Sequence, residues 1–540
     1  MTETTTPPAL SRRQVLVIFL GLLLGLLIVG LDQTTVSVAA PTIVQDLGGM
    51  NDFAWVFTAN LIAAAAAAPL FGKLSDLYGR RALFLTALLF FLVGSAACGL
   101  AQDMTQLIVA RGIQGVGAGG LTAMVIVVVG EIVAPRARAG WQGYIGAELA
   151  LANVVGPWFG GYLTDNLSWR WVFFINIPVG LVALVVTFVT LRVPVTRIRA
   201  TVDWLGAGLL VATLSCLMLV FSWGGIRYAW GSSQILGLAL ATLVLLAIFV
   251  LAERRAAEPI LPLRLFRNDV VTVALVLMFL AGASLFSMTF YMPAVLQIVI
   301  GVSATNSGLL LFPLMAGVVA MSIVSGHVVA ATGRYRLWPI AGTGVAAVGL
   351  FLLSRITPST GRAMAIAAMV VLGLGLGCIV QLMVVITQNA VSRRDLGVAS
   401  ATTGLFRIVG GAVGTGLFGA ILSSRLVSAV AENLPPGALP PGVNPAFLAQ
   451  QPAAAQQMPP PVRAGLAAAY ADVFQVIFLV AALIALLAFV AALFLRQLPM
   501  RDDARDPVAE TGAEVPAPRA AGTDPAGQAQ SGVAPDRHAT

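Results

Sequence analysis

Four ionisable side chains lie inside long apolar runs of this sequence: Asp32, Arg111, Glu148 and Arg407. A charged side chain at the centre of a bilayer costs at least ~2.5–3.5 kcal/mol, so such a residue needs a partner or a task. A carboxyl group in these surroundings can bind and release protons, whereas a guanidinium group can pair with a carboxylate or with an anionic molecule. The pattern therefore predicts ion pairing and proton binding inside a hydrophobic medium.

The composition is that of a membrane protein. Of the 540 residues, 59% are hydrophobic and 10% are charged, whereas a soluble domain has roughly 25% charged residues. So few polar side chains cannot cover a water-facing surface of this size. The Arg and Lys residues, which give a net charge of +8, lie in short clusters between apolar runs. This distribution indicates membrane topology and argues against nucleic-acid binding.

Helical spans are the elements that must position the four residues. A span needs about 20 mostly apolar residues, and fourteen segments qualify, near 15–40, 53–72, 82–101, 106–130, 140–163, 169–191, 203–222, 233–252, 270–296, 305–330, 335–354, 362–388, 397–421 and 472–496. If the N-terminus is inside, the cytoplasmic connections hold about three times as many Arg and Lys residues as the opposite ones. We therefore predict an all-α integral membrane fold with both termini in the cytoplasm.

These spans divide the chain into predicted parts. They are a cytoplasmic N-terminus (1–14), a six-helix bundle (15–191), two additional helices (203–252), a second six-helix bundle (270–496) with an extracytoplasmic loop (423–471), and a disordered cytoplasmic tail (497–540). The loop and the tail are rich in Pro and Ala, and neither has the composition of a large core.

Two predicted spans end in a similar pattern. The segments GKLSDLYGRR (72–81) and GHVVAATGR (326–334) share the same seven-residue step between two glycines, although Ala330 stands where the first segment has Asp76. Repeats of this kind are typical of carriers whose two halves move around a central site.

Metal, cofactor and enzyme chemistry are not indicated. Cys98, Cys216 and Cys378 lie far apart in apolar runs, and the two histidines add no metal-ligand spacing. The segment GVGAGG (115–120) fits GxGxxG but lies within a span, where small residues let helices approach closely. An integral membrane enzyme would need clustered His, Asp or Glu at one interface, and the sequence has no such cluster. Paired intramembrane charges and a repeat favour a moving carrier over a channel, and no GxxxxGK[ST] loop points to ATP.

Several motifs resemble those of the major facilitator superfamily, in particular its fourteen-span drug:proton antiporters of the EmrB/QacA-like branch. The matching segments, in order, are LDQTTVSVAAPTI (31–43), GKLSDLYGRR (72–81), RGIQGVGAGG (111–120), GAELALANVVGPWFGG (146–161) and LSWRWVFFINIPVG (167–180). The resemblance covers nearly the whole chain. It implies two six-helix bundles plus two linker helices, and proton-driven efflux by alternating access.

Asp32, Arg111 and Glu148 are the predicted proton-coupling residues. Asp32 and Arg111 lie at a similar depth in spans that run in opposite directions, so they can form an ion pair with which proton binding would compete. A purely structural pair that locks the two spans together is the alternative. Glu148 lies nearer the cytoplasmic end of its span, and we expect the two acids to serve as outer and inner proton stations. Glu148 could instead reach toward the inner interface or cap a helix contact.

The loop motif predicts a cytoplasmic gate made of Gly72, Asp76, Gly79, Arg80, Arg81 and Glu131. Asp76 and Arg80 are spaced for pairing on one helical turn, and Arg81 can reach Glu131. Such pairs would hold the two halves together until the cytoplasmic side opens. The alternative is that these charges only set the topology.

A second motif and a set of cavity candidates complete the prediction. Gly146, Gly156, Pro157, Gly160 and Gly161 resemble a pattern of the family's exporters, and Pro157 is expected to kink its helix. Trp169 and Trp171 fit an aromatic belt at the outer interface. The cavity candidates are Arg407, for which a structural and a cargo-binding role are equally open, and Phe290, Tyr291, Met292 and Gln297, for which packing is the alternative.

The expected function is export of amphipathic small molecules such as drugs, antibiotics or biocides in exchange for protons. A lipid or lipophilic-metabolite exporter on the same fold is the alternative within transport. The expected partners are the lipid bilayer, the small amphipathic substrate and protons, with no nucleic acid and no cofactor. The expected location is a bacterial cell membrane, and the expected functional unit is a monomer.

Overall fold

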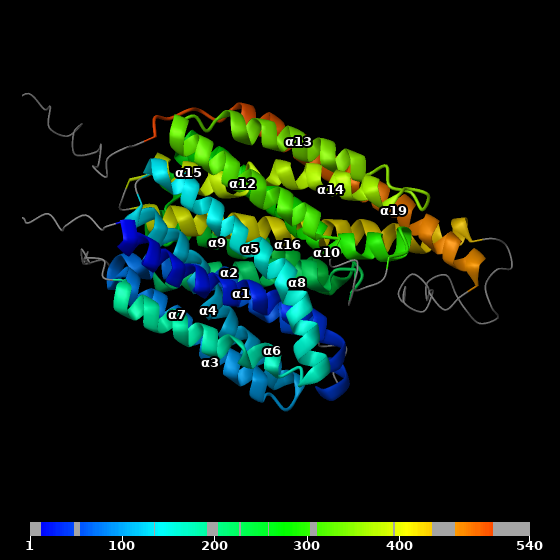
Figure 1. The fold of residues 1–540 in the computed structure, drawn as a ribbon, viewed down its shortest axis with the longest axis horizontal. Coiled ribbons are helices and arrows are strands. Elements are labelled where there is room, and N and C mark those ends of the chain that lie inside the picture. Colours follow the sequence, from blue (N-terminus) through cyan, green and yellow to red (C-terminus); the bar gives the residue numbers. More distant parts are fainter. Residues whose placement is uncertain are drawn as a thin grey trace, which may run out of the picture. The chain divides into compact units, whose positions relative to one another are not determined.

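The computed structural model describes residues 12–47, 54–133, 135–191, 203–225, 228–256, 259–302, 310–392, 395–434 and 459–500. All of them belong to one compact unit, Met1–Ala504. Helices dominate this part of the chain (Figure 1). The sequence dictates this outcome because a backbone in an apolar medium must satisfy its own hydrogen bonds, which a helix does within one segment. The predicted tail from residue 501 onward lies outside the described residues.

The N-terminal half is a bundle in which α4 is surrounded by its neighbours. Its helices are α1 (Arg12–Leu47), α2 (Ala54–Tyr78), α3 (Arg80–Leu100), α4 (Met104–Ile132), α5 (Pro135–Asn166), α6 (Trp171–Phe174) and α7 (Asn176–Thr190). Helix α4 packs against α2 and α3, and α1 packs against α5 and α7. Asp103 starts α4 by accepting a hydrogen bond from Gln106 N (2.8 Å), which satisfies one of the free amides at the helix start.

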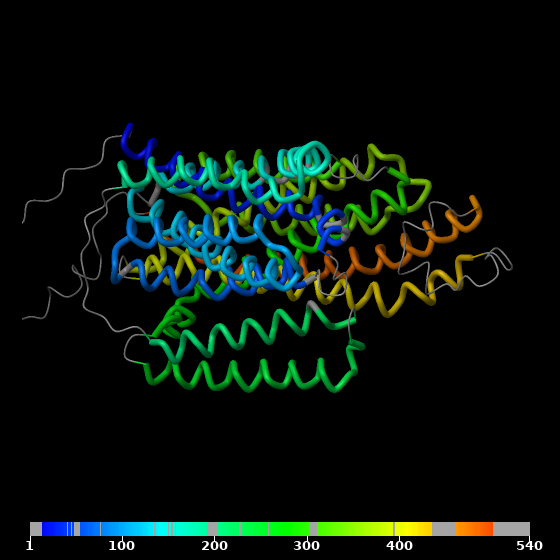
Figure 2. Tube along the Cα trace, turned by 90° about the horizontal axis from the view of Figure 1, so that it is seen from below, coloured from blue at the N-terminus to red at the C-terminus, as the bar shows by residue number. Residues whose placement is uncertain are grey.

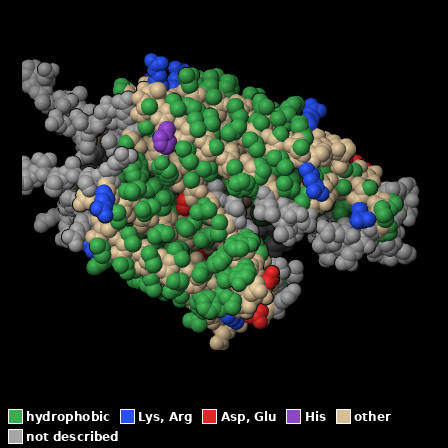
Figure 3. Space-filling model, viewed as in Figure 1, with side chains coloured by type: hydrophobic (Ala, Val, Ile, Leu, Met, Phe, Trp, Pro, Cys, Tyr) green, Lys and Arg blue, Asp and Glu red, His purple; other side chains and the backbone are tan. Residues whose placement is uncertain are grey.

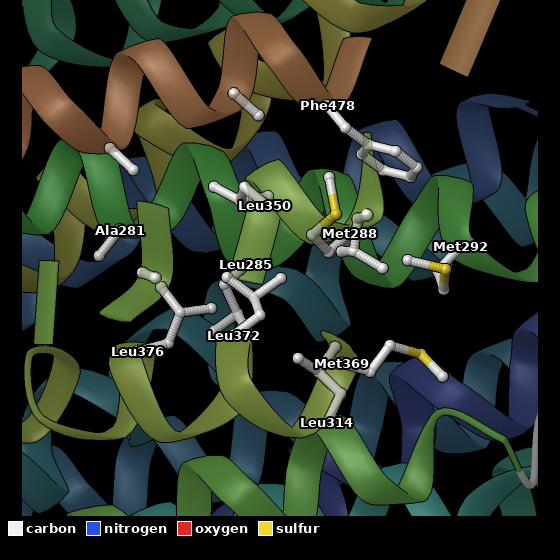
Figure 4. Close-up of a cluster of buried hydrophobic side chains, with 14 of the residues drawn as sticks. Ala281, Leu285, Met288, Met292, Leu314, Leu350, Met369, Leu372, Leu376 and Phe478 are labelled. Carbon is white, nitrogen blue, oxygen red and sulfur yellow. The ribbon is translucent and has the colours of Figure 1, made fainter. Parts of the chain in front are cut away.

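The C-terminal half is a second bundle with a more continuous apolar core. It contains η1 (Leu263–Arg267), α10 (Asp269–Ala294), the π-helix η2 (Val295–Val299), α12 (Phe312–Thr332), α13 (Leu337–Leu353), α14 (Arg362–Gly377), α15 (Val380–Ala390), α16 (Leu396–Asn433) and α19 (Pro460–Leu493). The predicted span 362–388 is thus broken between α14 and α15. Met288, Met292 and Met369 pack with Leu285, Leu314, Leu372, Leu376 and Phe478 in the core (Figure 4).

Two further helices, α8 (Trp204–Trp223) and α9 (Ser233–Arg255), form a hairpin at one edge of the molecule (Figure 2). They share a hydrophobic cluster with α2 and α16, to which Ala65, Leu210, Phe249 and Leu405 contribute. The hairpin therefore covers the seam at which α2 of one half meets α16 of the other.

Twelve of the described helices are long and apolar enough to cross a membrane. Two of the fourteen predicted spans fall on helices that fail this test. Helix α13 is shorter, with 17 residues, and α5 has 32 residues but carries polar side chains such as Gln142 and Glu148. The count of fourteen stays a prediction. Hydrophobic side chains cover most of the face seen in Figure 3, and the Lys and Arg side chains lie mainly toward its two ends, as expected for a protein that crosses a bilayer.

The predicted loop 423–471 is shorter than expected. Helix α16 continues to Asn433 and α19 begins at Pro460, so both ends of the predicted loop are helical; residues 435–458 lie outside the described residues. Asn433 Nδ2 donates to Asp472 Oδ2 (3.0 Å), and Leu426, Val430, Val462 and Leu466 are buried. Their spacing of four residues continues the buried helical stripe beyond the predicted span ends. The predicted boundary assumed that each helix ends where a single span would.

The most extensive contacts between the two halves are those of α5 with α12, α2 with α16, α4 with α16, and α5 with α15. Both ends of the described chain lie at one end of the bundle, here called the termini side (Figure 1). Gln388 Nε2 of α15 donates to Ile126 O of α4 (3.2 Å), near the ends of both helices on that side. The halves are therefore in contact at the termini side.

Candidate functional site in the membrane core

Asp32 and Arg111 form a buried ion pair between α1 and α4. Each residue is 1% exposed, and Arg111 Nη1 lies 2.5 Å from Asp32 Oδ2. The predicted contact between these two residues is therefore confirmed. A proton that binds to Asp32 removes the charge with which Arg111 pairs, so the proton and the guanidinium group compete for one carboxylate.

Two amide side chains and a hydroxyl that the sequence analysis did not single out complete the network. Gln114 Nε2 donates to Asp32 Oδ1 (2.8 Å), and Gln114 Oε1 accepts from Arg111 Nη1 (2.6 Å). Asn176 Nδ2 of α7 donates to Asp32 Oδ1 (3.2 Å) and to Ser95 Oγ (2.9 Å). A buried ion pair is tolerated when its remaining polar atoms are hydrogen-bonded, which these side chains achieve. Gln114 could have been found from the sequence, because it is an amide inside an apolar run and lies one helical turn from Arg111.

Arg111 is also anchored outside the pair. Its Nε donates to Val56 O of α2 (3.1 Å), and its Cζ lies 5.9 Å from the centroid of the Phe173 ring. The guanidinium group thus contacts residues of α1, α2, α4 and α6 at once.

Glu148 of α5 is the second acid in the core, and its surroundings differ from those of Asp32. Its Oε1 is buried and has no hydrogen-bond partner among the described residues. A methyl group at Gly30 of α1 would lie 3.1 Å from this oxygen. Glu148 can therefore gain or lose a proton without breaking an ion pair.

The predicted separation of the two acids is wrong. The carboxyl group of Glu148 reaches Gly30, which lies two residues from Asp32 and therefore only ~3 Å away along the axis of α1. The two acids lie on different sides of α1, because two residues rotate a helix by about 200°. The prediction of outer and inner stations counted from assumed span ends, whereas α5 begins at Pro135, several residues before the expected span.

The glycines of α5 let two different helices approach it. A Cβ atom on Gly156 or Gly160 would clash with Thr34 or Thr35 of α1, and a Cβ atom on Gly161 would only touch Val38. Gly146 faces Ser322 of the other half at 3.5 Å. Helix α5 continues through Pro157 without a break. These small residues place α5 between α1 and α12.

The predicted gate residues are arranged differently from the expectation. Arg80, and not Arg81, contacts Glu131, with 2.8 Å between Arg80 Nε and Glu131 Oε2. Arg81 donates to Phe188 O and lies 4.4 Å from the centroid of the Phe188 ring. The two arginines diverge because adjacent residues point about 100° apart on a helix. The Arg80–Glu131 pair joins α3 to α4 within one half, so it does not itself link the halves. The side chain of Asp76 lies outside the described residues.

The glycines of the repeated pattern do link the halves. A Cβ atom on Gly72 of α2 would lie 2.9 Å from Ala401 Cβ of α16, and one on Gly326 of α12 would lie 2.2 Å from Ala139 O of α5. The second glycine of each pattern ends its helix with a positive φ, 93° at Gly79 and 69° at Gly333, a conformation that favours glycine. The repeat is therefore present in the structure at equivalent positions of both halves.

The cavity candidates separate into core and surface residues. Met292 is fully buried in the C-terminal core, which contradicts a cavity role. Tyr291 is also buried, and its hydroxyl donates to Thr415 O (2.8 Å). Phe290 is 65% exposed. Gln297 is half-buried and lies in the π-helix η2. Arg407 of α16 is half-buried, and its Cζ lies 5.8 Å from the centroid of the Phe286 ring.

Trp169 is a core residue and not part of an aromatic belt. It is 3% exposed, and its Nε1 donates to Asp46 Oδ2 of α1 (2.9 Å). Trp171 is 46% exposed, which fits the belt prediction. No group of three or more His, Cys, Asp or Glu side chains that could hold a metal ion occurs in the described ranges.

Comparisons with known proteins agree with this architecture. The family model for the Major Facilitator Superfamily matches residues 22–415. An uncharacterized MFS-type transporter of Mycobacterium tuberculosis is 38% identical over 495 residues, which cover 92% of this chain and 71% of the relative. Multidrug resistance protein 3 of Bacillus subtilis is 37% identical over 419 residues, covering 78% of this chain and 81% of the relative.

A solved structure shares the fold. The crystal structure of the human organic anion transporter MFSD10 aligns with a TM-score of 0.60 over 90% of this chain and 100% of that chain, at 15% sequence identity. At this identity the likeness speaks for the fold alone. The Mycobacterium tuberculosis relative is named as a transporter, and the apolar helices of the described part of this chain fit a multi-span membrane protein. The chain belongs to the Major Facilitator Superfamily.

Proposed function

We propose that this protein is a proton-coupled secondary active exporter of amphipathic small molecules such as drugs, antibiotics or biocides. Two acids carry the proposal: Asp32 of α1, in an ion pair with Arg111, and Glu148 of α5, whose buried Oε1 has no hydrogen-bond partner in the part of the chain that the structure describes. Ionisable groups in the membrane core are costly and mark proton pathways, and either carboxyl group could carry the coupled proton. Multidrug relatives in Bacillus subtilis support export as the direction of transport.

The contacts between the halves support alternating access as the mechanism. Gly72 and Gly326 bring the helices of the two halves into close contact, and small residues allow packed helices to slide or separate without displacing large side chains. Protonation of Asp32 would release Arg111, while Glu148 would exchange its proton beside Gly30. We propose that these two events are linked to the opening of one side and the closing of the other.

Location and assembly follow from the same reasoning. The protein resides in a cell membrane, with both termini in the cytoplasm, and acts as a monomer driven by the proton gradient without a cofactor. The basic residues between the spans support this orientation.

Reconstituted vesicles test the proposal. The purified protein is reconstituted into proteoliposomes that enclose a pH-sensitive dye. A pH gradient is then imposed, and cationic, neutral and anionic amphiphiles are added one at a time. We expect at least one cargo to be moved against its own gradient while protons move the opposite way, and we expect Glu148→Gln to abolish both fluxes. Cargo movement that is independent of the pH gradient would refute proton coupling, and proton or ion leak without cargo would indicate a channel.

A further inference from the structure

Arg407 is a cation in the middle of the membrane core of the C-terminal half. It lies eleven residues after Leu396, the first residue of α16, which is ~17 Å along the helix and about half the thickness of the hydrocarbon layer. An arginine side chain is too short to bring its charge from this depth to the lipid headgroups by itself.

The charge of Arg407 has no acidic partner in the part of the chain that the structure describes. The group in contact with its guanidinium is the ring of Phe286, at 5.8 Å. Between Asp269 and Glu432 the sequence contains one acidic residue, Asp395. Asp395 lies at the start of α16 and pairs with Arg264 (2.6 Å). Beyond Glu432, Asp472 of α19 is exposed and accepts a hydrogen bond from Asn433 Nδ2 (3.0 Å). Neither Asp395 nor Asp472 forms an ion pair with Arg407 among the described residues.

The two acids of the N-terminal half are directed elsewhere. Asp32 is held by Arg111, Gln114 and Asn176. The buried oxygen of Glu148 faces the backbone of α1 at Gly30. Each of these acids contacts other elements of its own half, and neither forms an ion pair with Arg407.

The backbone that carries Arg407 is fixed by close helix packing. A Cβ atom on Gly282 of α10 would lie 2.1 Å from Arg407 O, and one on Gly410 would lie 2.0 Å from Phe279 O. Phe286 lies against Gly411, one turn beyond Arg407 on α16. Helices α10 and α16 thus hold an arginine and an aromatic ring together in a defined geometry.

We propose that the cargo of this exporter carries an acidic group (a carboxylate, sulfonate or phosphate) that binds to Arg407, with an apolar part that packs near Phe286. This inference rests on the proposed function and names its substrate class. An uncompensated cation in the membrane core is costly, and a planar guanidinium group offers two parallel donors to an oxyanion. A cationic cargo would be repelled, and a neutral cargo would leave the charge without a partner.

The charge of an acidic cargo affects how its export is energised. When an anion leaves the cell and a proton enters, both movements carry positive charge inward. Export of an acidic cargo is then driven by the membrane potential as well as by the pH gradient. Export of a monovalent cation in exchange for one proton moves no net charge. The charge of the cargo therefore determines the response to an imposed potential.

Three fluorescent probes of the same shape test the inference: pyrenebutyrate, pyrenebutyramide and pyrenebutylamine. Binding to the purified protein is measured by fluorescence anisotropy. We expect the wild type to bind the acid at least about tenfold more tightly than the amide, because only the acid can form a charge-assisted hydrogen bond with Arg407.

Arg407→Gln should remove this preference for the acid and leave the affinity for the amide unchanged. Arg407→Lys should keep part of it. Arg425→Gln, an exposed arginine of the same helix, is the matched control and should keep all of it.

Equal affinity of the wild-type protein for the acid and the amide would overturn the inference. This measurement uses the wild type alone, so it does not depend on whether a variant folds. A preference for the acid that survives Arg407→Gln would overturn it as well. In proteoliposomes, proton exchange with the amine or the amide but not with the acid would refute the acidic cargo and leave the proposed function standing. An acid preference that depends on Arg407, without proton exchange for any probe, would support the binding site and refute the proposed function.

Discussion

The two halves of this protein share a helical plan but hold their charges in opposite ways. The N-terminal half surrounds an ion pair, Asp32–Arg111, with amide and hydroxyl groups and places a second acid, Glu148, nearby. The C-terminal half has a core of Leu and Met side chains, and its half-buried Arg407 has no acidic partner among the described residues. The glycines at which the halves meet, Gly72 and Gly326, are equivalent. The two halves therefore share the close helix contacts at these glycines. They differ in their buried charges: Asp32 and Glu148 lie in the N-terminal half, and Arg407, without an acidic partner among the described residues, lies in the C-terminal half.

Removing the paired acid should have the largest effect. Asp32→Asn keeps the shape and the hydrogen bonds to Gln114 and Asn176 but cannot bind a proton, so we expect a loss of pH-driven cargo transport of about 100-fold or more, the scale of losing a positioned proton-transfer group. Initial rates in proteoliposomes measure it. Glu432→Gln, at the exposed end of α16, is the control and should transport normally. A pH-driven rate in Asp32→Asn equal to that of the wild type would remove the carboxyl group from the mechanism.

The two intramembrane arginines should differ in their effect on stability. Arg111→Gln leaves Asp32 buried beside no cation, which costs about 3–5 kcal/mol. Arg407→Gln removes a charge that has no acidic partner, so we expect the free energy of unfolding to stay the same or to rise. Thermal unfolding in detergent at neutral pH compares the two variants directly. An equal loss of stability in both would show that Arg407 is paired as firmly as Arg111 and would erase the contrast between the halves.

Alanine substitutions of the two equivalent glycines, Gly72 and Gly326, should lower stability by smaller and unequal amounts. Gly326→Ala places a Cβ atom 2.2 Å from a backbone oxygen, Ala139 O, whereas Gly72→Ala places one 2.9 Å from a side-chain atom, Ala401 Cβ. Overpacking of this kind costs about 1–3 kcal/mol, and we expect Gly326→Ala to lie at the upper end and Gly72→Ala at the lower end. Melting temperatures, together with transport rates, report the difference. The reverse order would mean that the α2–α16 contact is the tighter of the two.

The smallest effect is expected in the C-terminal core. Tyr291→Phe removes the hydrogen bond to Thr415 O (2.8 Å) and keeps the ring, which costs about 1 kcal/mol. Affinity for pyrenebutyrate should not change, because Tyr291 packs in the core and does not line a binding site. A large change in cargo affinity with unchanged stability would show that Tyr291 takes part in cargo binding.

Much of the fold could be predicted from the sequence because apolar length and basic loops are local signals. The contact between Asp32 and Arg111 was also predictable, since two buried charges of opposite sign in antiparallel spans need each other. Gln114 and Asn176 were missed because amides in apolar runs have many possible partners, and the sequence alone does not show which helices are neighbours.

The errors concern helix rotation and helix ends. Arg80 rather than Arg81 contacts Glu131 because the positive φ of Gly79 sets the rotation of α3, which spacing alone does not give. The depth of Glu148 was misjudged because α5 starts before its apolar stretch. Trp169 was assigned to the interface because belt and core tryptophans look alike in sequence, and only its contact with Asp46 distinguishes them.

Cargo binding and proton release should be linked at Asp32 of α1 and at Glu148, which lies against α1. The most direct measurement adds a transported cargo to the purified protein in a weakly buffered detergent solution and records the protons released. We expect the release of roughly one proton per bound cargo, as binding linkage requires for one titrating group. The variant that removes the titrating acid, either Glu148→Gln or Asp32→Asn, should release none. If cargo binds to the wild type with no change in proton binding, and with the same affinity at acidic and alkaline pH, cargo and protons are not coupled in this protein.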